Sequence, residues 1–297
     1  LLFIIFIDDI ANLIENCSVH LYADDTVIYF SHTDVHVIEE KLNSDMTNIY
    51  SWLCCSKLSL NLDKTVSMLF GSRNLLNKCN NLKITINDFN IQQVYSTKYL
   101  GILLDPYLKW DLHIDQICTR ISKLISFLSR LRHSINFSNL KIVYNALILP
   151  IFDYGDLVYS NACDKHTTRL QKLQNRACRI MLGISPYTHL PIVELHKRVK
   201  LKSLAARRLC HLNTMVFKSL NDFAPSYLNR MFQFRNCNYS LRSIGSLSLP
   251  YPRTEFCRKS FLYRGSKSYN NLPSDIKSST SLNTFNKKIN LYISDFV

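Results

Sequence analysis

The sequence predicts an α+β protein, with short strands and one helix in its first third and helices over most of the remainder. Two patterns support this class. Strand-forming residues alternate on both sides of an aspartate pair near the start of the chain, whereas apolar residues recur every three or four positions beyond Pro106. The composition, 47% hydrophobic and 20% charged over 297 residues, is that of a folded globular protein.

The first third of the chain alternates strand and helix patterns. Residues 18–30 predict two antiparallel strands joined by a tight turn, with Asp24 and Asp25 at its tip. Residues 34–53 predict an amphipathic helix that packs on a sheet, because their apolar side chains fall on one helical face. Further strands are predicted at 65–70, 82–86, 89–95 and 98–104, with Asn87-Asp88 as a hairpin turn.

Helical periodicity dominates after Pro106. The predicted helices cover 110–133, 138–149 ended by Pro150, 164–182 with Asp164 as N-cap and Gly183 as stop, about 195–220, and a last one starting near Ser281 with Leu282, Phe285 and Ile289 facing inward. Residues 236–273 are rich in Ser, Asn, Tyr and Arg with weak periodicity, and we expect mixed loop and short strand there.

Composition also narrows the class of protein. No apolar run approaches the roughly 20 residues of a spanning helix, and LLFIIFI at the start lacks the basic flank of a secretion signal. The ten cysteines show no zinc-ligand spacing and are expected to be reduced thiols. We therefore expect an intracellular protein, in the nucleus or cytoplasm or both, without a membrane partner. Because Leu1 falls inside an apolar run, we also expect a fragment of a longer chain.

The charge is divided unevenly along the sequence. Residues 1–108 carry 7 Lys and Arg against 12 Asp and Glu, a net −5, and residues 109–297 carry 29 against 10, a net +19. This asymmetry suits a polyanion-binding surface beside a metal site, although a merely soluble basic protein has the same balance.

The adjacent aspartates at the predicted hairpin tip need a physical explanation. Two carboxylates about 4 Å apart repel by about 4 kcal/mol at an effective dielectric constant of 20, so they need open water or a cation. Mg²⁺ prefers such hard oxygen ligands and bridges carboxylates to phosphates, and two ions about 3.5–4 Å apart serve nucleotidyl transfer. A solvated turn is the simpler alternative, because Asp is common in turns.

The surrounding stretches carry a family resemblance. Leu21-Tyr22-Ala23-Asp24-Asp25 resembles the Tyr-x-Asp-Asp box of reverse transcriptases. LLFIIFIDDI resembles the segment after the Pro-Gln-Gly motif of non-LTR retrotransposon polymerases, with Asp8-Asp9 where Asn-Asp is usual. WLCCSKLSLNLDKTVSMLF and KYLGILLD resemble the next two polymerase motifs, and YNALILPIFDYGDLVYS, LQKLQNRACRIMLGI and RTEFCRKSFLYRGSKSYNNLP resemble the C-terminal region of jockey-like elements. The resemblance covers essentially the whole chain.

The resemblance implies the second half of a right-handed polymerase palm, an antiparallel sheet with a packed helix, at 1–104. A helical thumb at 105–183 and a mixed basic C-terminal extension at 184–297 would follow. The implied activity is RNA-directed DNA synthesis with two Mg²⁺ ions, on an RNA template and a DNA primer, from dNTPs.

Residue roles follow from the same motifs. Asp24 and Asp25 would be catalytic metal ligands, with Asp24 the surer one, and Tyr22 would pack near the primer terminus. Lys64 matches the position that protonates leaving pyrophosphate, with a solvated strand-edge lysine as the alternative. Tyr99, Leu100 and Gly101 match the primer-contacting turn, where glycine permits close backbone approach; a simple bulge is the alternative for Gly101.

Part of the family's machinery has no counterpart in this sequence. A further metal-binding aspartate and the nucleotide-binding fingers would precede Leu1, and Asp8 or Asp9 is a poor substitute because the match places this pair at a helix end. We therefore expect a fragment that is inactive by itself. Two alternatives stay open: a nucleic-acid-binding remnant without catalysis, and a Mg²⁺-dependent phosphohydrolase that adds Asp153 or Asp156 to the aspartate pair.

The predicted helix at 164–182 carries a line of positive charge at intervals of three and four, made of Arg169, Lys172, Arg176 and Arg179. Such a line can track nucleic-acid phosphates, or it can be a solvated face without a partner. Several aromatic residues of the helical region are candidates for base stacking but are expected mostly in the core: Trp110, Tyr144, Phe152, Tyr154 and Tyr159.

Overall fold

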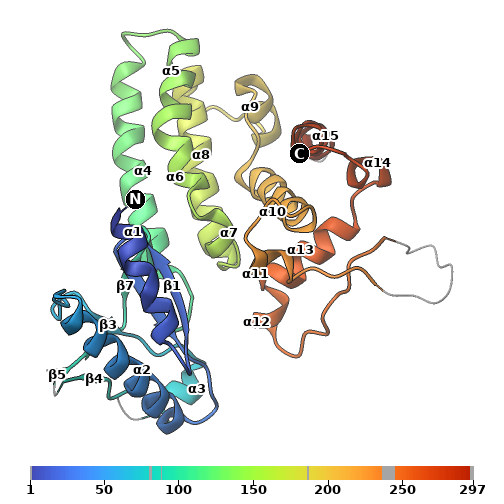
Figure 1. The fold of residues 1–297 in the computed structure, drawn as a ribbon. Coiled ribbons are helices and arrows are strands. Elements are labelled where there is room, and N and C mark those ends of the chain that lie inside the picture. Colours follow the sequence, from blue (N-terminus) through green and yellow to red (C-terminus); the bar gives the residue numbers. More distant parts are fainter. Residues whose placement is uncertain (1, 80–81, 88, 186, 236–244, 295–297) are drawn as a thin grey trace. The chain divides into compact units, whose positions relative to one another are not determined.

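The computed structural model describes residues 2–79, 82–87, 89–185, 187–235 and 245–294. The chain forms two compact units, Leu1–Lys109 and Trp110–Val297. The first contains helices and small sheets, and the second is almost entirely helical (Figure 1). This confirms the predicted α+β class at the level of secondary structure.

The first unit contains four separate two-stranded sheets. Three of them are antiparallel, β1–β2, β4–β5 and β7–β8, whereas β3 and β6 pair in parallel. Its elements are α1 Leu2–Ile7, the 3₁₀ helix η1 Asp8–Leu13, β1 Ser18–Tyr22, β2 Asp25–Tyr29, α2 Val35–Cys55, β3 Val66–Ser67, α3 Arg73–Leu76, β4 Thr85–Ile86, β5 Phe89–Asn90, β6 Gln92–Gln93, β7 Thr97–Tyr99 and β8 Ile102–Leu104.

The helix predicted at 34–53 is confirmed as α2. The Asp34 carboxylate accepts a hydrogen bond from the His36 backbone N–H at 2.9 Å, which satisfies one of the free donors at the helix start. The inner face of α2 is buried against residues that follow in the chain, and this core includes Ile38, Met46, Ile49, Leu53, Leu82, Ile84 and Ile86.

Most of the later strands are shorter than predicted. For the strand predicted at 82–86, side chains take up the backbone donors. The N–H groups of Lys83 and Thr85 donate to Glu39 and Asn43 of α2, both at 2.8 Å. The strand predicted at 82–86 is therefore reduced to Thr85–Ile86. Its hairpin partner β5 is present and Asn87 has φ +44°, while the other predicted turn residue, Asp88, lies outside the described residues.

The second unit consists of two packed helical layers around separate apolar clusters. Helix α4 packs on α8, and α10 packs on α13 and α15 (Figure 1). Its elements are α4 Asp111–Leu131, α5 Phe137–Val143, the π-helix η2 Tyr144–Ile148, α6 Leu149–Asp153, α7 Asp156–Tyr159, α8 Asp164–Leu182, α9 Ile192–Val199, α10 Leu204–Leu220, α11 Ser226–Asn229, α12 Glu255–Arg258, α13 Phe261–Asn270, α14 Ser274–Lys277 and α15 Leu282–Ser294.

The long helices confirm the predicted periodicity. Ile114, Ile121 and Leu128 of α4 are fully buried, and so are Phe285 and Ile289 of the last helix. Helix α8 ends where predicted, because Gly183 adopts φ +74° and its N–H bonds to the carbonyls of the preceding turn.

Pro150 does not end a helix, contrary to the prediction. The chain widens into a single π-helical stretch at Tyr144–Ile148, where the Leu149 N–H bonds to the Tyr144 carbonyl. Pro150 then stands in the first turn of α6, where its missing N–H needs no partner. The helical path therefore continues through the proline.

Three other expectations for the helical region are wrong. Residues 195–220 are two helices rather than one, because Lys200 adopts φ +56° and Ser203 caps the start of α10. The segment predicted as loop and strand contains the ten-residue helix α13, capped by Ser260; residues 236–244 of that segment lie outside the described residues. The N-cap of α8 is Cys163, and Asp164 is its first helical residue.

The aromatic residues of this unit are mostly in its core, as predicted. Trp110, Tyr144, Phe152 and Tyr159 are at most 3% exposed, whereas Tyr154 is 58% exposed. Within the described residues, no helix has the length and apolar character needed to span a bilayer.

Candidate functional site

The hairpin that carries the aspartate pair forms as predicted. Tyr22 of β1 pairs with Asp25 of β2, so Ala23 and Asp24 form a two-residue turn. Asp24 thus lies in the turn and Asp25 is the first residue of β2. Both residues are exposed, and Ala23 adopts φ +53°, a left-handed conformation that is uncommon for alanine.

The geometry of the hairpin fits a divalent cation only in part. The two aspartates offer exposed carboxylate oxygens, the ligand type that Mg²⁺ prefers. Among the described residues, no third His, Cys, Asp or Glu forms a three-ligand group with them. The chain therefore supplies two protein ligands at this turn, and further ligands would have to come from a longer protein, from substrate phosphates or from water.

A buried carboxylate on α2 fixes the chain where it enters β1, and sequence reasoning missed it. Asp45 is fully buried and accepts hydrogen bonds from the N–H groups of Cys17 at 2.8 Å and Asn16 at 3.1 Å, and from the Asn16 side chain at 3.0 Å. The available signal was an acidic residue on the otherwise apolar stripe of α2.

The pKa values of Asp45 and of its neighbour Cys17 are both shifted. Burial opposes ionisation of Asp45, but the hydrogen bonds from Asn16 and Cys17 outweigh it and lower the pKa of the carboxyl group. Burial and the neighbouring carboxylate together raise the pKa of Cys17 to about 12. The ionised Asp45 is thus the form that holds the start of the hairpin.

Tyr22 lies on the exposed face of the hairpin. Its side chain is 64% exposed, and the alternating burial of β1 places His20 on the same face. His20 stacks on Tyr29 of β2 with ring centroids 5.4 Å apart. The exposed face of this hairpin therefore presents aromatic rings next to the two carboxylates.

The turn predicted to contact a primer is a second tight hairpin. Tyr99 pairs with Ile102, and the two residues between them, Leu100 and Gly101, have φ +44° and +81°. Positive φ at both positions is the requirement of a type I′ turn, which glycine meets without strain. Gly101 therefore lies in a tight two-residue turn rather than a bulge. Its contact with a primer stays a prediction.

Lys64 lies in an exposed turn just before β3. Its backbone N–H bonds to the side-chain and backbone oxygens of Asn61, at 3.1 and 3.3 Å. Its role with a leaving group stays a prediction.

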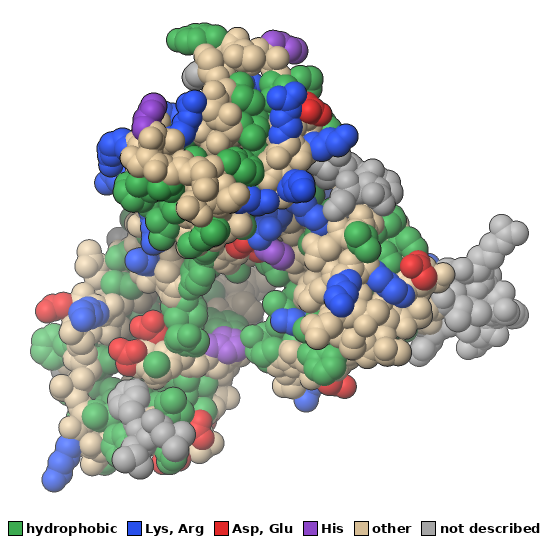
Figure 2. Space-filling view, turned by 90° about the horizontal axis from the view of Figure 1, so that it is seen from above, with side chains coloured by type: hydrophobic (Ala, Val, Ile, Leu, Met, Phe, Trp, Pro, Cys, Tyr) green, Lys and Arg blue, Asp and Glu red, His purple; other side chains and the backbone are tan. Residues whose placement is uncertain are grey.

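The four basic residues of α8 lie in different surroundings. Arg169 forms an ion pair with Asp115 of α4 at 2.7 Å, and Arg179 donates to the carbonyls of Ser185 and Thr188. Lys172 and Arg176 are exposed, with no carboxylate within 4.0 Å among the described residues. Two members of the line thus stabilise the fold, and two face solvent. Figure 2 shows one face of the molecule, on which Lys and Arg side chains (blue) gather in groups.

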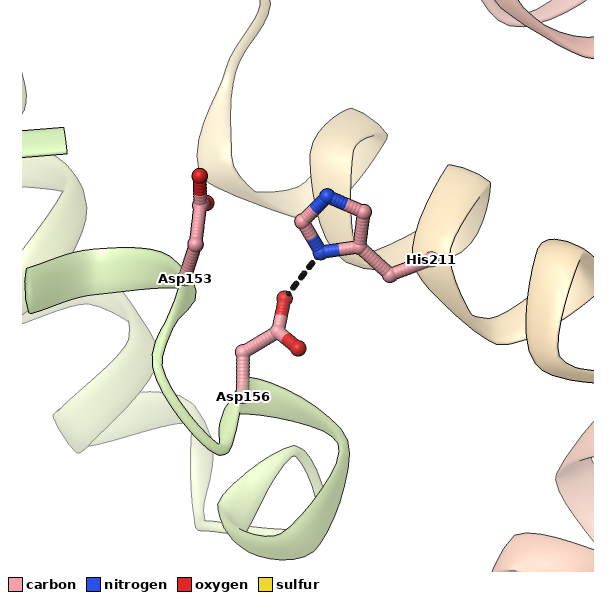
Figure 3. Close-up of side chains that lie close together, drawn as sticks. All are labelled: Asp153, Asp156 and His211. Atoms are coloured by element: carbon pink, nitrogen blue, oxygen red, sulfur yellow. Dashed lines mark hydrogen bonds and ion pairs between the residues drawn. The ribbon is translucent and has the colours of Figure 1, made fainter. Parts of the chain in front are cut away.

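A second acidic group lies within the helical unit. One ligand atom each from Asp153, Asp156 and His211 fall within 4.8 Å of one another (Figure 3). His211 Nδ1 lies 2.6 Å from Asp156 Oδ2, and the guanidinium of Arg207 bonds to both oxygens of Asp153, through Nε at 3.0 Å. Arg207 thus occupies both oxygens of Asp153, while Asp156 and His211 bind each other. The phosphohydrolase hypothesis stays a prediction.

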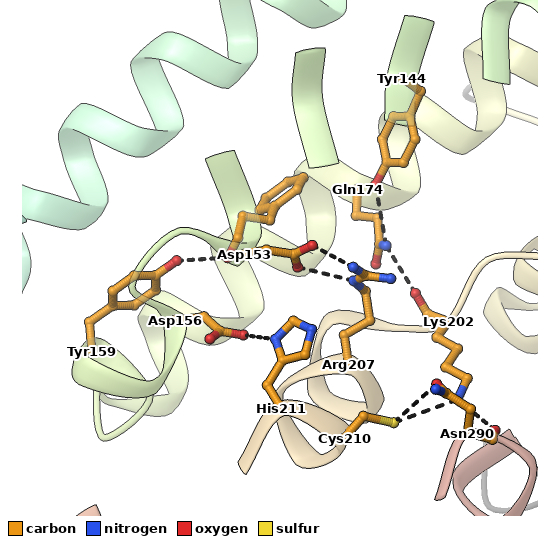
Figure 4. A network of polar contacts seen from close by, with 11 residues as sticks. Tyr144, Asp153, Asp156, Tyr159, Gln174, Lys202, Arg207, Cys210, His211 and Asn290 are labelled. Carbon is orange, nitrogen blue, oxygen red and sulfur yellow. Dashed lines mark hydrogen bonds and ion pairs between the residues drawn. The ribbon is translucent and has the colours of Figure 1, made fainter. Parts of the chain in front are cut away.

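A neighbouring network links Lys202, in the connection between α9 and α10, to three helical segments. Gln174 of α8 donates to the Lys202 carbonyl at 3.0 Å, and Lys202 Nζ donates to the backbone and side-chain oxygens of Asn290 in α15, at 2.6 and 2.8 Å (Figure 4). The Tyr144 hydroxyl accepts from Gln174, and burial raises the pKa of Tyr144. Sequence reasoning missed these pairs, because their members are 28 to 88 residues apart.

Part of this chain is similar to a known protein family. Residues 1–104 match the family model described as reverse transcriptase (RNA-dependent DNA polymerase). Over 72% of its length the chain is 24% identical to the probable RNA-directed DNA polymerase from transposon X-element of Drosophila melanogaster, and the match covers 22% of that protein. The polymerases of mobile element jockey from Drosophila funebris and Drosophila melanogaster are 25% and 24% identical over 60% and 67% of the chain, which is 19% and 22% of their own lengths.

No solved structure matches the chain. The chain spans about a fifth of the length of these relatives. Residues 1–104 thus match a reverse transcriptase domain, and the chain is distantly similar to the jockey and X-element retrotransposon polymerases over part of their length.

Proposed function

We propose that this chain is part of the RNA-directed DNA polymerase of a non-LTR retrotransposon, in which Asp24 and Asp25 hold Mg²⁺ for nucleotidyl transfer. The observation that carries the proposal is the register of the β1–β2 hairpin. It presents both carboxylates at one exposed turn, inside the region that matches the reverse transcriptase family. Within this proposal, 1–104 is part of the palm, 105–183 the thumb and 184–297 a basic extension.

Each predicted residue has a physical task in this proposal. The bound ions would activate the attacking primer hydroxyl and stabilise the leaving group. Asp24 and Asp25 supply negative charge that keeps the ions at the turn, and Tyr22 offers an exposed ring to the primer end. Lys64 would donate a proton to pyrophosphate, and the turn at Leu100-Gly101 would contact the primer backbone.

The substrates are an RNA template, a DNA primer and dNTPs. Because the chain spans about a fifth of its relatives, we propose templated synthesis for a longer protein and none for this chain by itself. For this chain by itself we propose only the binding of metal and nucleic acid.

This proposal is tested by the effect of magnesium on primer–template binding at constant ionic strength, which excludes simple charge screening. We expect at least about a fivefold gain in affinity with Mg²⁺ over EDTA, about 1 kcal/mol. Asp24→Asn should remove most of the gain, measured by fluorescence anisotropy of a labelled RNA–DNA primer–template.

The matched control is the other adjacent pair of exposed aspartates in this unit. The double substitution Asp8→Asn and Asp9→Asn removes two negative charges, whereas Asp24→Asn removes one. It should nevertheless leave the magnesium-dependent gain in affinity intact. An equal magnesium-dependent gain in affinity in the wild type and Asp24→Asn would show that the aspartate pair does not hold the metal.

A nucleic-acid-binding protein without catalysis is the second candidate. The net charge of +19 over residues 109–297 and the exposed side chains of Lys172 and Arg176 support it. It is distinguished by binding that depends on salt but is unaffected by magnesium at constant ionic strength.

A further inference from the structure

A buried arginine of α10 has donor groups without acceptors. Arg208 is 9% exposed, and its Nε and Nη2 atoms have no hydrogen-bond partner among the described residues. Its guanidinium carbon lies 5.5 Å from the centre of the buried ring of Tyr159 in α7. An aromatic face attracts a cation but accepts few hydrogen bonds, so the guanidinium retains donors for another group.

A second arginine lies close enough to repel the first. Arg264 of α13 donates from Nη1 to the Ser160 hydroxyl at 2.6 Å. Burial, and then the charge of Arg208, lower the pKa of Arg264. Arg208 contacts Tyr159 and Arg264 contacts the next residue, Ser160, so guanidinium groups from two helices meet the same end of α7. Placing two positive charges at one half-buried position is unfavourable without an anion.

The nearby carboxylates do not serve this pair. Among the described residues, neither arginine has a carboxylate oxygen within 4.0 Å. Asp153 is engaged by the neighbouring Arg207, and Asp156 by His211 (Figure 4). The described residues therefore provide carboxylate partners for Arg207 and His211 but none for Arg208 and Arg264.

We propose that Arg208 and Arg264 form a binding site for a phosphate group, with Ser160 as a positioning residue for Arg264. Ser160 also donates its hydroxyl hydrogen to the Leu157 carbonyl at 2.8 Å, which fixes its oxygen as the acceptor for Arg264. The planar fork of an arginine matches phosphate oxygens, and a phosphate group has enough oxygens for two such forks.

The backbone of a nucleic acid is the source of phosphate that the charge favours, because residues 109–297 carry a net +19. Arg264 and Ser160 are only partly buried, which gives an anion a route from solvent. The site is independent of polymerase activity, because it uses no residue assigned to nucleotidyl transfer.

The experiment titrates the full chain with inorganic phosphate in a calorimeter, at constant ionic strength in chloride. The variants are Arg208→Met and Arg264→Gln, with Arg130→Gln of α4 as an exposed control of equal charge. We expect affinity for phosphate to fall about tenfold or more in each of the two variants and to stay unchanged in the control.

Arg208→Met is chosen because it replaces a buried charge by an apolar side chain of similar length, a change that is often tolerated. A circular dichroism melt of each variant without phosphate identifies any loss of folding, and Arg264→Gln repeats the test at a more exposed position. Equal phosphate affinity in the wild type and both variants, or no binding by the wild type, would overturn the site.

A second arm identifies the source of the phosphate. The same variants are titrated against a single-stranded RNA of mixed sequence by fluorescence anisotropy. Weaker RNA binding in both variants, with competition by inorganic phosphate in the wild type, assigns the site to the nucleic-acid backbone. Unchanged RNA binding together with lost phosphate binding assigns it to a small phosphate compound.

Discussion

At the scale of single residues, Asp45 shows how much one buried carboxylate contributes to a candidate active site. It accepts four hydrogen bonds of 3.3 Å or less from Glu15, Asn16 and Cys17, which directly precede β1. The hairpin with Asp24 and Asp25 begins at Ser18. The position of the candidate metal ligands therefore depends on a residue that would not itself touch metal.

The first prediction concerns Asp45→Asn. We expect a loss of about 1–3 kcal/mol in the free energy of unfolding at pH 7, because an amide cannot accept all of these bonds. The lowered pKa of Asp45 means that its stabilisation is complete above about pH 4 and is lost as pH falls through the folded-state pKa. The difference between wild type and variant should therefore shrink below pH 4, as measured by urea unfolding.

Asp63→Asn serves as the control, since Asp63 is exposed in a turn of the same unit. It should change stability by less than about 0.5 kcal/mol at either pH. A pH-independent loss in Asp45→Asn would show that the charge of Asp45 contributes nothing.

Candidate residues within a short sequence motif could be predicted, whereas residues whose partners lie far away in the sequence were missed. Asp24 and Asp25 lie in a short motif between two strand patterns, so they were identifiable at once. Arg208 and Arg264 lie 56 positions apart, and only the packing of α10 on α13 brings them together. Asp45 was missed for the same reason, because its carboxylate oxygens accept hydrogen bonds from residues 28 to 30 positions earlier in the chain.

At the scale of elements, helices were predictable and strand lengths were not. The long helices α2, α4 and α8 follow a period of 3.6 residues, which is a repeated signal within one segment. The extent of β4 depends on where side chains such as Asn43 compete for backbone donors. The π-helical stretch before Pro150 likewise depends on tertiary packing rather than on local propensity.

The second prediction concerns the two solvent-facing cations of α8. The double substitution Lys172→Gln and Arg176→Gln should lower the slope of log affinity against log salt by about 1.5, since each phosphate contact contributes about 0.7–0.9. Binding of single-stranded RNA at several salt concentrations measures the slope. Arg169→Gln should act mainly on stability, because Arg169 pairs with Asp115.

Lys123→Gln together with Arg130→Gln removes the same charge from exposed positions of α4. If this pair lowers the slope as much as the α8 pair, binding reflects net charge and α8 has no special role.

At the scale of the whole molecule, the division of charge follows the division of structure. The first unit contains the hairpin with its carboxylates and is net negative, and all of the excess positive charge lies in the second. The family match covers residues 1–104, which is nearly the first unit.

The third prediction is that the two units unfold separately. The chain has two tryptophans, Trp52 in the first unit and Trp110 in the second, so each unit has its own fluorescence probe. The first unit should unfold at lower urea, because its core is built on one long helix and two-stranded sheets that are marginal alone. In Trp52→Phe, circular dichroism should show a transition that Trp110 fluorescence does not follow.

The reciprocal variant Trp110→Phe reports through Trp52. It loses the hydrogen bond from the Trp110 indole to Asn161, of 2.7 Å, so the second transition should shift to lower urea while the Trp52 transition stays in place. Coincident transitions for all probes in both variants would instead mean a single cooperative structure.

The pairing of Asp153 with Arg207 and of Asp156 with His211 has a consequence for shortened copies of such a gene. A protein that stopped soon after Gly183 would retain both acids and lose both bases. Asp156, only 4% exposed in the 297-residue chain, would then lose its contact with His211. Premature stop codons in this stretch should therefore yield products prone to degradation.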